Sequence, residues 1–81
     1  MKVTVQLFAR ARDLAGTGAL SVDVPPGATV ADLRRQLAER CPALARLLEH
    51  SALAVNNDLA GDGLAIPATA EVALLPPVSG G

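Results

Sequence analysis

Residues 29–40, TVADLRRQLAER, carry the strongest secondary-structure signal of the chain. Thr29 is typical of a helix N-cap, and Asp32 follows three residues later, as in a capping box. Apolar residues recur at helical spacing along one face: Val30, Leu33, Leu37 and Cys41. Charged residues, among them Arg34, point away from that face. The pattern predicts an amphipathic helix over residues 29–40 whose apolar face packs against a core.

A strand is predicted before this helix, at residues 2–9. Apolar and polar side chains alternate over its first part, which is typical of a strand with one buried face. Phe8 departs from the alternation, because it places an aromatic ring on the face that Thr4 and Gln6 mark as hydrated. An apolar group is therefore expected on the outer side of the sheet.

Turn signals separate the other elements. Residues 11–15 predict a short helical turn that ends at Gly16, and residues 20–24 predict a second strand, paired with the first as a hairpin. A shorter helix is predicted from Pro42 to about His50. Further strands are predicted at residues 53–55, around Leu59 and at residues 71–75. The order is strand, strand, helix, strands.

Length and composition limit the classes of function. The chain has 81 residues, enough for one domain, and is 51% hydrophobic with a formal net charge of −1. It lacks the basic stripe that neutralises a row of phosphates, and Phe8 is its single aromatic residue. Nucleic acid is therefore not expected as a partner.

Location and metal binding follow from simple absences in the sequence. The first residues lack a secretory signal, and no apolar run is long enough to cross a bilayer, so we expect a cytoplasmic protein without a membrane partner. Cys41 cannot form an internal disulfide, and its helical spacing indicates a packed thiol. His50 has no second ligand at useful spacing, so no metal is expected.

The last six residues, PPVSGG at 76–81, differ in character from the domain expected at residues 1–75. Pro76 and Pro77 favour an extended spacer, whereas Gly80 and Gly81 have no side chains and wide backbone freedom. A partner's cleft could take up such a tail as far as its carboxylate. We therefore expect the carboxylate of Gly81 to be the working group, although glycine-rich termini are also often simply frayed.

Three segments resemble the ubiquitin-like sulfur carriers of the MoaD and ThiS type, above all the small subunits of molybdopterin synthase. Residues 8–16, FARARDLAG, are similar to the segment after the first strand of those subunits. Residues 55–59, VNNDL, resemble their Val-Asn-x-x-Leu stretch. The terminal PPVSGG is similar to the family ending Pro-Pro-Val-Thr/Ser-Gly-Gly, and it is the most specific of the three.

The resemblance implies an α+β, ubiquitin-like β-grasp fold: a mixed sheet of four to five strands on one main helix, with a short second helix. It also implies a chemical cycle at Gly81. An E1-like enzyme uses ATP to adenylate the terminal glycine, and a sulfur donor enzyme converts the adenylate to a thiocarboxylate. The large catalytic subunit of molybdopterin synthase, in a heterotetramer, then transfers the sulfur to cyclic pyranopterin monophosphate. The carrier itself binds no cofactor and is not catalytic alone.

The same resemblance implies the residues that contact partners. Phe8, Leu59 and Leu75 are expected to form a hydrophobic docking patch on the outer sheet face. Arg12 matches the arginine of the family's Phe-Ala-x-x-Arg segment and is either paired with an acidic group of a partner or simply solvated. The tail residues Pro76, Pro77, Val78 and Ser79, with Gly80, are expected to thread into a partner.

Other functions stay open at this point. A ubiquitin-like modifier would be joined to lysines of other proteins through Gly81 after the same activation. A thiamine-type carrier shares the Gly-Gly end but generally lacks a segment like FARARDLAG. A plain binding module would function unchanged without Gly81.

Overall fold

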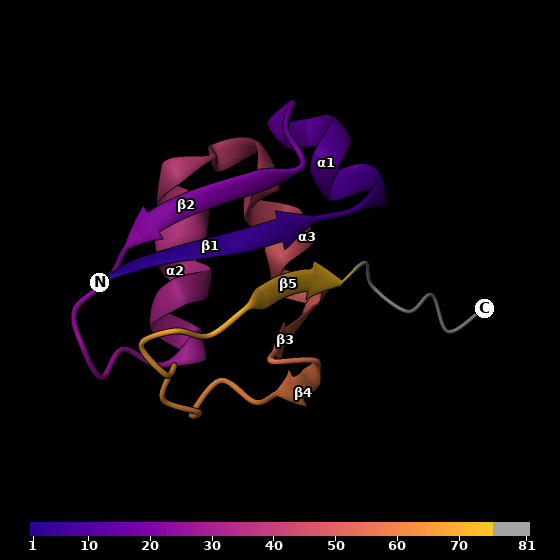
Figure 1. Cartoon of the computed structure of the whole chain (residues 1–81). Coiled ribbons are helices and arrows are strands. Elements are labelled where there is room, and N and C mark those ends of the chain that lie inside the picture. Colours follow the sequence, from indigo (N-terminus) through magenta and orange to yellow (C-terminus); the bar gives the residue numbers. More distant parts are fainter. Residues whose placement is uncertain (76–81) are drawn as a thin grey trace.

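A five-stranded mixed sheet forms one layer of the protein, and the main helix covers one of its faces (Figure 1). The computed structural model describes residues 1–75. The strands are β1 (Lys2–Leu7), β2 (Ala19–Asp23), β3 (Ala52–Val55), β4 (Asp58–Ala60) and β5 (Val72–Leu75). Their order in the sheet is β2-β1-β5-β3-β4.

The last strand, β5, lies in the middle of the sheet. It pairs in parallel with β1, where Leu7 is opposite Leu74, and antiparallel with β3, where Ala52 is opposite Leu75. The pairs β1–β2 and β3–β4 are antiparallel. The chain therefore reaches Leu75 at the sheet end where β1 finishes and β3 starts.

Helix α2 (Val30–Arg40) confirms the prediction for residues 29–40. The Thr29 hydroxyl oxygen accepts a hydrogen bond from the Asp32 backbone N–H at 3.3 Å, and the Asp32 carboxylate accepts one from the Thr29 N–H at 3.0 Å. The backbone hydrogen bond from Thr29 is the main cause that lowers the pKa of Asp32. The capping box thus fixes the start of the helix.

The core lies between the sheet and the helices. The other helices are α1 (Ala9–Ala15), the 3₁₀ helix η1 (Pro42–Leu44) and α3 (Ala45–His50). Strands contribute side chains of one parity, and α2 contributes its apolar face. The largest fully buried side chains are Val5, Val30, Leu33, Leu37, Leu44, Leu48, Leu53, Val72 and Leu74.

The first strand is shorter than predicted, and the helix after it is longer. β1 ends at Leu7 rather than residue 9, and α1 begins at Ala9 rather than residue 11. Ala9 has a φ of 49°, in the left-handed region, which turns the chain out of the sheet. The Phe8 carbonyl then accepts a hydrogen bond from the Ala11 N–H at 3.1 Å. Alternation alone does not reveal this turn, because Ala9 still follows it and Phe8 departs from it only by carrying an apolar side chain.

Two asparagines form the turn between β3 and β4. Asn56 and Asn57 have φ values of 52° and 72°, which asparagine tolerates better than most residues. The Asn56 side-chain oxygen also accepts a hydrogen bond from the Glu71 N–H at 3.0 Å. This contact ties the turn to the start of β5.

Arg34 is placed differently from the prediction, which put it on the solvent side of the main helix. Its guanidinium donates hydrogen bonds to the Leu48 carbonyl and, at 2.9 Å, to the Ser51 carbonyl. It also forms an ion pair with Asp62 at 3.1 Å. The helical pattern did not predict this, because η1 and α3 return along α2 and cover the side of α2 that carries Arg34. Arg34 therefore links α2 through hydrogen bonds to the segment that leads into β3.

Candidate functional site

The predicted tail residues Pro76, Pro77, Val78, Ser79, Gly80 and Gly81 lie outside the described residues. What the structure does describe is the surface from which the chain continues toward them. That surface surrounds Leu75, the last residue of β5. Two features meet there, one on the outer face of the sheet and one between α1 and α3.

The first feature is an apolar surface on the outer face of the sheet. Strand register places Ala52 opposite Leu75, and Ala54 opposite both Ala73 and Leu59. Phe8 follows Leu7, whose partner is Leu74, so an extended Phe8 lies beside Leu75. We call this surface the outer apolar patch and define it by six residues: Phe8, Ala52, Ala54, Leu59, Ala73 and Leu75.

The large side chains of this patch are accessible to a partner. Leu59 is 74% exposed and Phe8 is 48% exposed, while Leu75 is half-buried. The alanines between them carry no side chain beyond Cβ, so the large side chains protrude from a flat surface. Large apolar side chains gathered on one face are typical of a protein interaction site. The strand register thus places Phe8, Leu59 and Leu75 on the same face of the sheet, and their docking role stays a prediction.

The other half of the outer face is polar. Thr4 and Ser21 lie opposite each other on β1 and β2, with their hydroxyl oxygens 2.9 Å apart in a hydrogen bond. Lys2 lies opposite Asp23. All four residues are exposed. We call this surface the outer polar half.

Arg12 lies on α1, away from the outer apolar patch. It is exposed, and its Nε lies 3.9 Å from the place that a Cβ atom at Gly18 would take. Both ion pairs found within residues 1–75 involve other arginines. The proposed pairing of Arg12 with a partner's acidic group therefore stays a prediction.

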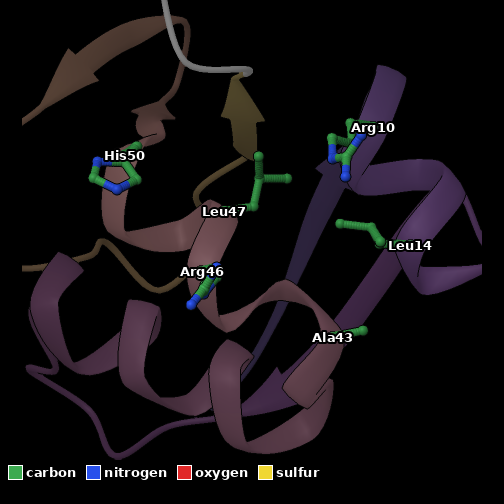
Figure 2. A pocket seen from close by; sticks show the side chains of 6 residues that line it. All are labelled: Arg10, Leu14, Ala43, Arg46, Leu47 and His50. Atoms are coloured by element: carbon green, nitrogen blue, oxygen red, sulfur yellow. The ribbon is translucent and has the colours of Figure 1, made fainter.

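The second feature is a basic cleft between α1 and α3, with a volume of about 320 Å³ (Figure 2). Its lining residues are Arg10, Leu14, Ala43, Arg46, Leu47 and His50. In Figure 2, Leu14 of α1 and Leu47 of α3 extend toward each other, and Arg46 and His50 lie on the α3 side. We call this feature the basic cleft.

The described part of the chain contains neither a cluster of metal-binding side chains nor a helix that could span a membrane. Within residues 1–75, no three His, Cys, Asp or Glu side chains come close enough together to hold a metal ion. No helix in the same range is long and apolar enough to cross a membrane. Cys41 is half-buried and packs against the core, as its helical spacing predicted.

Comparison with known proteins decides the family. The model of the ThiS family matches residues 5–81, nearly the whole chain. The chain belongs to the ThiS family. The molybdopterin synthase sulfur carrier subunit of Arabidopsis thaliana is 33% identical to it over 81 residues, covering 100% of this chain and 84% of the relative. That of Synechococcus elongatus is 44% identical over 68 residues, covering 76% and 73%.

A third relative of this ThiS-family chain carries a different name. Small archaeal modifier protein 1 of Haloferax volcanii is 38% identical over 84 residues, covering 94% of this chain and 97% of the relative. Its crystal structure has a TM-score of 0.86 and 36% identity, with full coverage of both chains. The fold is the ubiquitin-like β-grasp fold, as the resemblance implied.

Sequence reasoning missed the basic cleft of this ThiS-family chain. The cleft joins α1 to η1 and α3, which are separated in the sequence by β2 and α2. One local signal was available, because Arg10 and Leu14, like Arg46 and His50, are four residues apart and so share a helix face. That signal shows which residues share a face and leaves open which faces meet.

Proposed function

We propose that this chain is the sulfur carrier subunit of a molybdopterin synthase, with the C-terminal carboxylate of Gly81 as the carrying group. The observation that carries the proposal is the extent of the family match, which runs to residue 81 and so includes Gly80 and Gly81. The plant subunit of that name supports it, because it is 33% identical over all 81 residues of this chain.

The proposed cycle begins with activation, because a carboxylate is a poor electrophile. An E1-like enzyme joins the Gly81 carboxylate to the AMP portion of ATP and releases pyrophosphate. Sulfur supplied by a donor enzyme at the sulfide level then attacks the acyl carbon, the bond to AMP breaks, and a thiocarboxylate remains on Gly81. The thiocarboxylate sulfur forms a bond to a carbon of cyclic pyranopterin monophosphate, and water then cleaves the acyl–sulfur bond, which returns Gly81 to a carboxylate. Two charged carriers supply the two sulfurs of the dithiolene.

The chain contributes the carried group, and we assign catalysis to the activating enzyme and the large subunit. The fully buried side chains of the described domain are apolar and fill the space between sheet and helices. A reaction at the terminus therefore depends on partners that hold the end in position. In this proposal the chain works in the cytoplasm, binds no cofactor itself and contacts partners through residues 76–80.

The outer apolar patch is the surface that we propose for docking with the large subunit. Exposed Leu59 and Phe8 stand above flat alanines, so a partner can bury both side chains without displacing any part of the fold. Burying one exposed side chain of this size contributes roughly 1.5–3 kcal/mol. The patch also borders Leu75, so docking there positions the residues that lead to Gly81.

Intact-protein mass spectrometry tests the proposal. The full chain is incubated with the host's activating enzyme, ATP and a sulfur source, and a chain lacking Gly81 serves as the matched control. We expect one oxygen-to-sulfur exchange on the full chain and none on the shortened one. Absence of exchange, when a known carrier is converted in the same mixture, would contradict sulfur transfer.

Protein modification is a second candidate function, which the Haloferax volcanii relative favours. That relative is named as a modifier protein and is 38% identical over nearly the whole chain. In that case activated Gly81 forms an isopeptide bond with lysines of other proteins. Peptide mapping of cell extracts after expression of the chain would detect such adducts, and a chain lacking Gly81 should form none.

A further inference from the structure

The basic cleft is lined by basic and apolar side chains, and no carboxylate within residues 1–75 lines it or forms an ion pair with its arginines. Arg10, Arg46 and His50 line it, and no acidic residue does. The two ion pairs within residues 1–75 are Arg34–Asp62 and Arg35–Asp32, so neither Arg10 nor Arg46 takes part in one. Glu49, the acidic residue of α3, lines a different groove, beside Arg34 and Arg35.

The cleft lies at the sheet end from which the chain continues toward Gly81. Arg10 comes shortly after Leu7, the partner of Leu74, and His50 comes shortly before Ala52, the partner of Leu75. Both residues therefore lie just beyond the end of β5. A protein that holds the residues after Leu75 is within reach of the cleft.

The cleft and the outer apolar patch suit different kinds of contact. Apolar surface excluded from water gives lasting association, as between subunits of one complex. Charge complementarity on an exposed rim mainly raises the rate of encounter and weakens with salt, which suits a partner that must bind and leave. In the proposed cycle, the large subunit holds the carrier within the synthase during sulfur transfer, whereas the activating enzyme holds it only for activation.

We propose that the basic cleft docks an acidic segment of the activating enzyme. The acidic side chains of that segment face Arg10, Arg46 and His50, and an apolar side chain within it lies between Leu14 and Leu47. This inference rests on the proposed function, since it assumes that such an enzyme activates Gly81.

Charge reversal at the cleft rim tests the inference. Arg10→Glu and Arg46→Glu are compared with Arg40→Glu, a matched reversal of an exposed arginine on α2 that lines another groove. Pyrophosphate release by the activating enzyme is measured against carrier concentration, at low and at moderate salt. We expect each cleft reversal to raise KM about three- to tenfold at low salt, with kcat unchanged and a smaller effect at moderate salt. Arg40→Glu should change KM less than twofold. A charge on the surface outside the docking site is expected to have no larger effect than this.

The possible results separate this inference from the proposed function. If the unchanged chain is not adenylated at all, the proposed function fails and the inference fails with it. If the unchanged chain is adenylated and the cleft reversals behave like Arg40→Glu, only the inference fails. A loss of affinity for the large subunit with unchanged activation would also overturn it. Circular dichroism of each variant checks that a raised KM reflects docking rather than unfolding.

Discussion

The outer apolar patch and the outer polar half are two regions of one sheet face, and beneath them lies the same core. Val3, Val5 and Val22 are buried under the polar half, and Leu53, Val72 and Leu74 are buried under the patch. Folding therefore requires the inner side chains of both halves equally. The outer side chains differ because folding leaves them free to vary, so their difference carries information about partners rather than about stability.

The largest expected effect comes from adjacent residues on opposite faces of β5. Leu74→Ala removes a side chain that is 1% exposed and should lower the free energy of unfolding by about 3 kcal/mol. Leu75→Ala, on the patch, should lower it by less than about 1 kcal/mol, because part of that side chain is already hydrated. Urea denaturation of both variants measures the difference. Equal losses would contradict the division between fold and surface.

A second prediction concerns docking. Leu59→Arg places a charge in the outer apolar patch and should weaken binding to the large subunit about 30-fold, the effect of losing a residue worth about 2 kcal/mol. Thr4→Arg, the matched change on the outer polar half, should leave binding nearly unchanged. Calorimetric titration with the large subunit measures both. If Thr4→Arg weakens binding as much as Leu59→Arg, the partner does not distinguish the halves.

Arg34 holds the segment that leads into β3, on the side of the sheet that carries the patch. Arg34→Met should cost about 1–3 kcal/mol, since it leaves the Leu48 and Ser51 carbonyls without their charged donor. Arg35→Met, one position further along α2, removes an exposed ion pair and should cost less than about 1 kcal/mol. Thermal unfolding compares the two. Hydrogen exchange should then rise in β3 more than in β2 for Arg34→Met alone.

The smallest expected effect is the pH dependence of the stability that the capping box of α2 provides. This cap lies on the helix side of the sheet and distinguishes neither half of the outer face. Hydrogen bonding from Thr29 lowers the pKa of Asp32, so the folded state favours the carboxylate. The resulting stabilisation is fully present above the ordinary pKa of about 4, and is lost as pH falls through the lower value of the folded state. The stability difference between the unchanged chain and Asp32→Asn should therefore narrow on acidification from pH 5. A constant difference would show that the cap does not depend on the charge of Asp32.

Much of this fold could be predicted from local pattern. The capping box at Thr29 and the helical spacing after it define α2 before any tertiary contact is known. The outward position of Phe8 and Leu75 also follows from local pattern, because each is an apolar residue at a position with the parity of the outer face. The sequence could not predict that the patch includes Ala52, Ala54 and Ala73. Alanine is compatible with either face of a strand, and only the strand register brings these residues together.

The remaining features depend on contacts between distant elements. Whether Arg34 faces solvent or a carbonyl depends on where η1 and α3 run, and the periodicity of α2 does not contain that information. The basic cleft likewise exists only because α1 meets α3. The left-handed turn at Ala9 is a third case, because alanine is not a residue that signals positive φ.

The central position of β5 has a consequence for how the chain folds during synthesis. β5 is the last of the five strands to leave the ribosome. It is also the strand that joins the β1–β2 pair to the β3–β4 pair in the sheet, because it pairs with β1 on one side and with β3 on the other. Pairing over such sequence distances closes a large loop and is slow to form. A nascent or truncated chain that stops before residue 75 therefore has two unconnected hairpins with open edges, which proteases can attack. Cellular quality control can thus remove fragments that stop before β5 is complete.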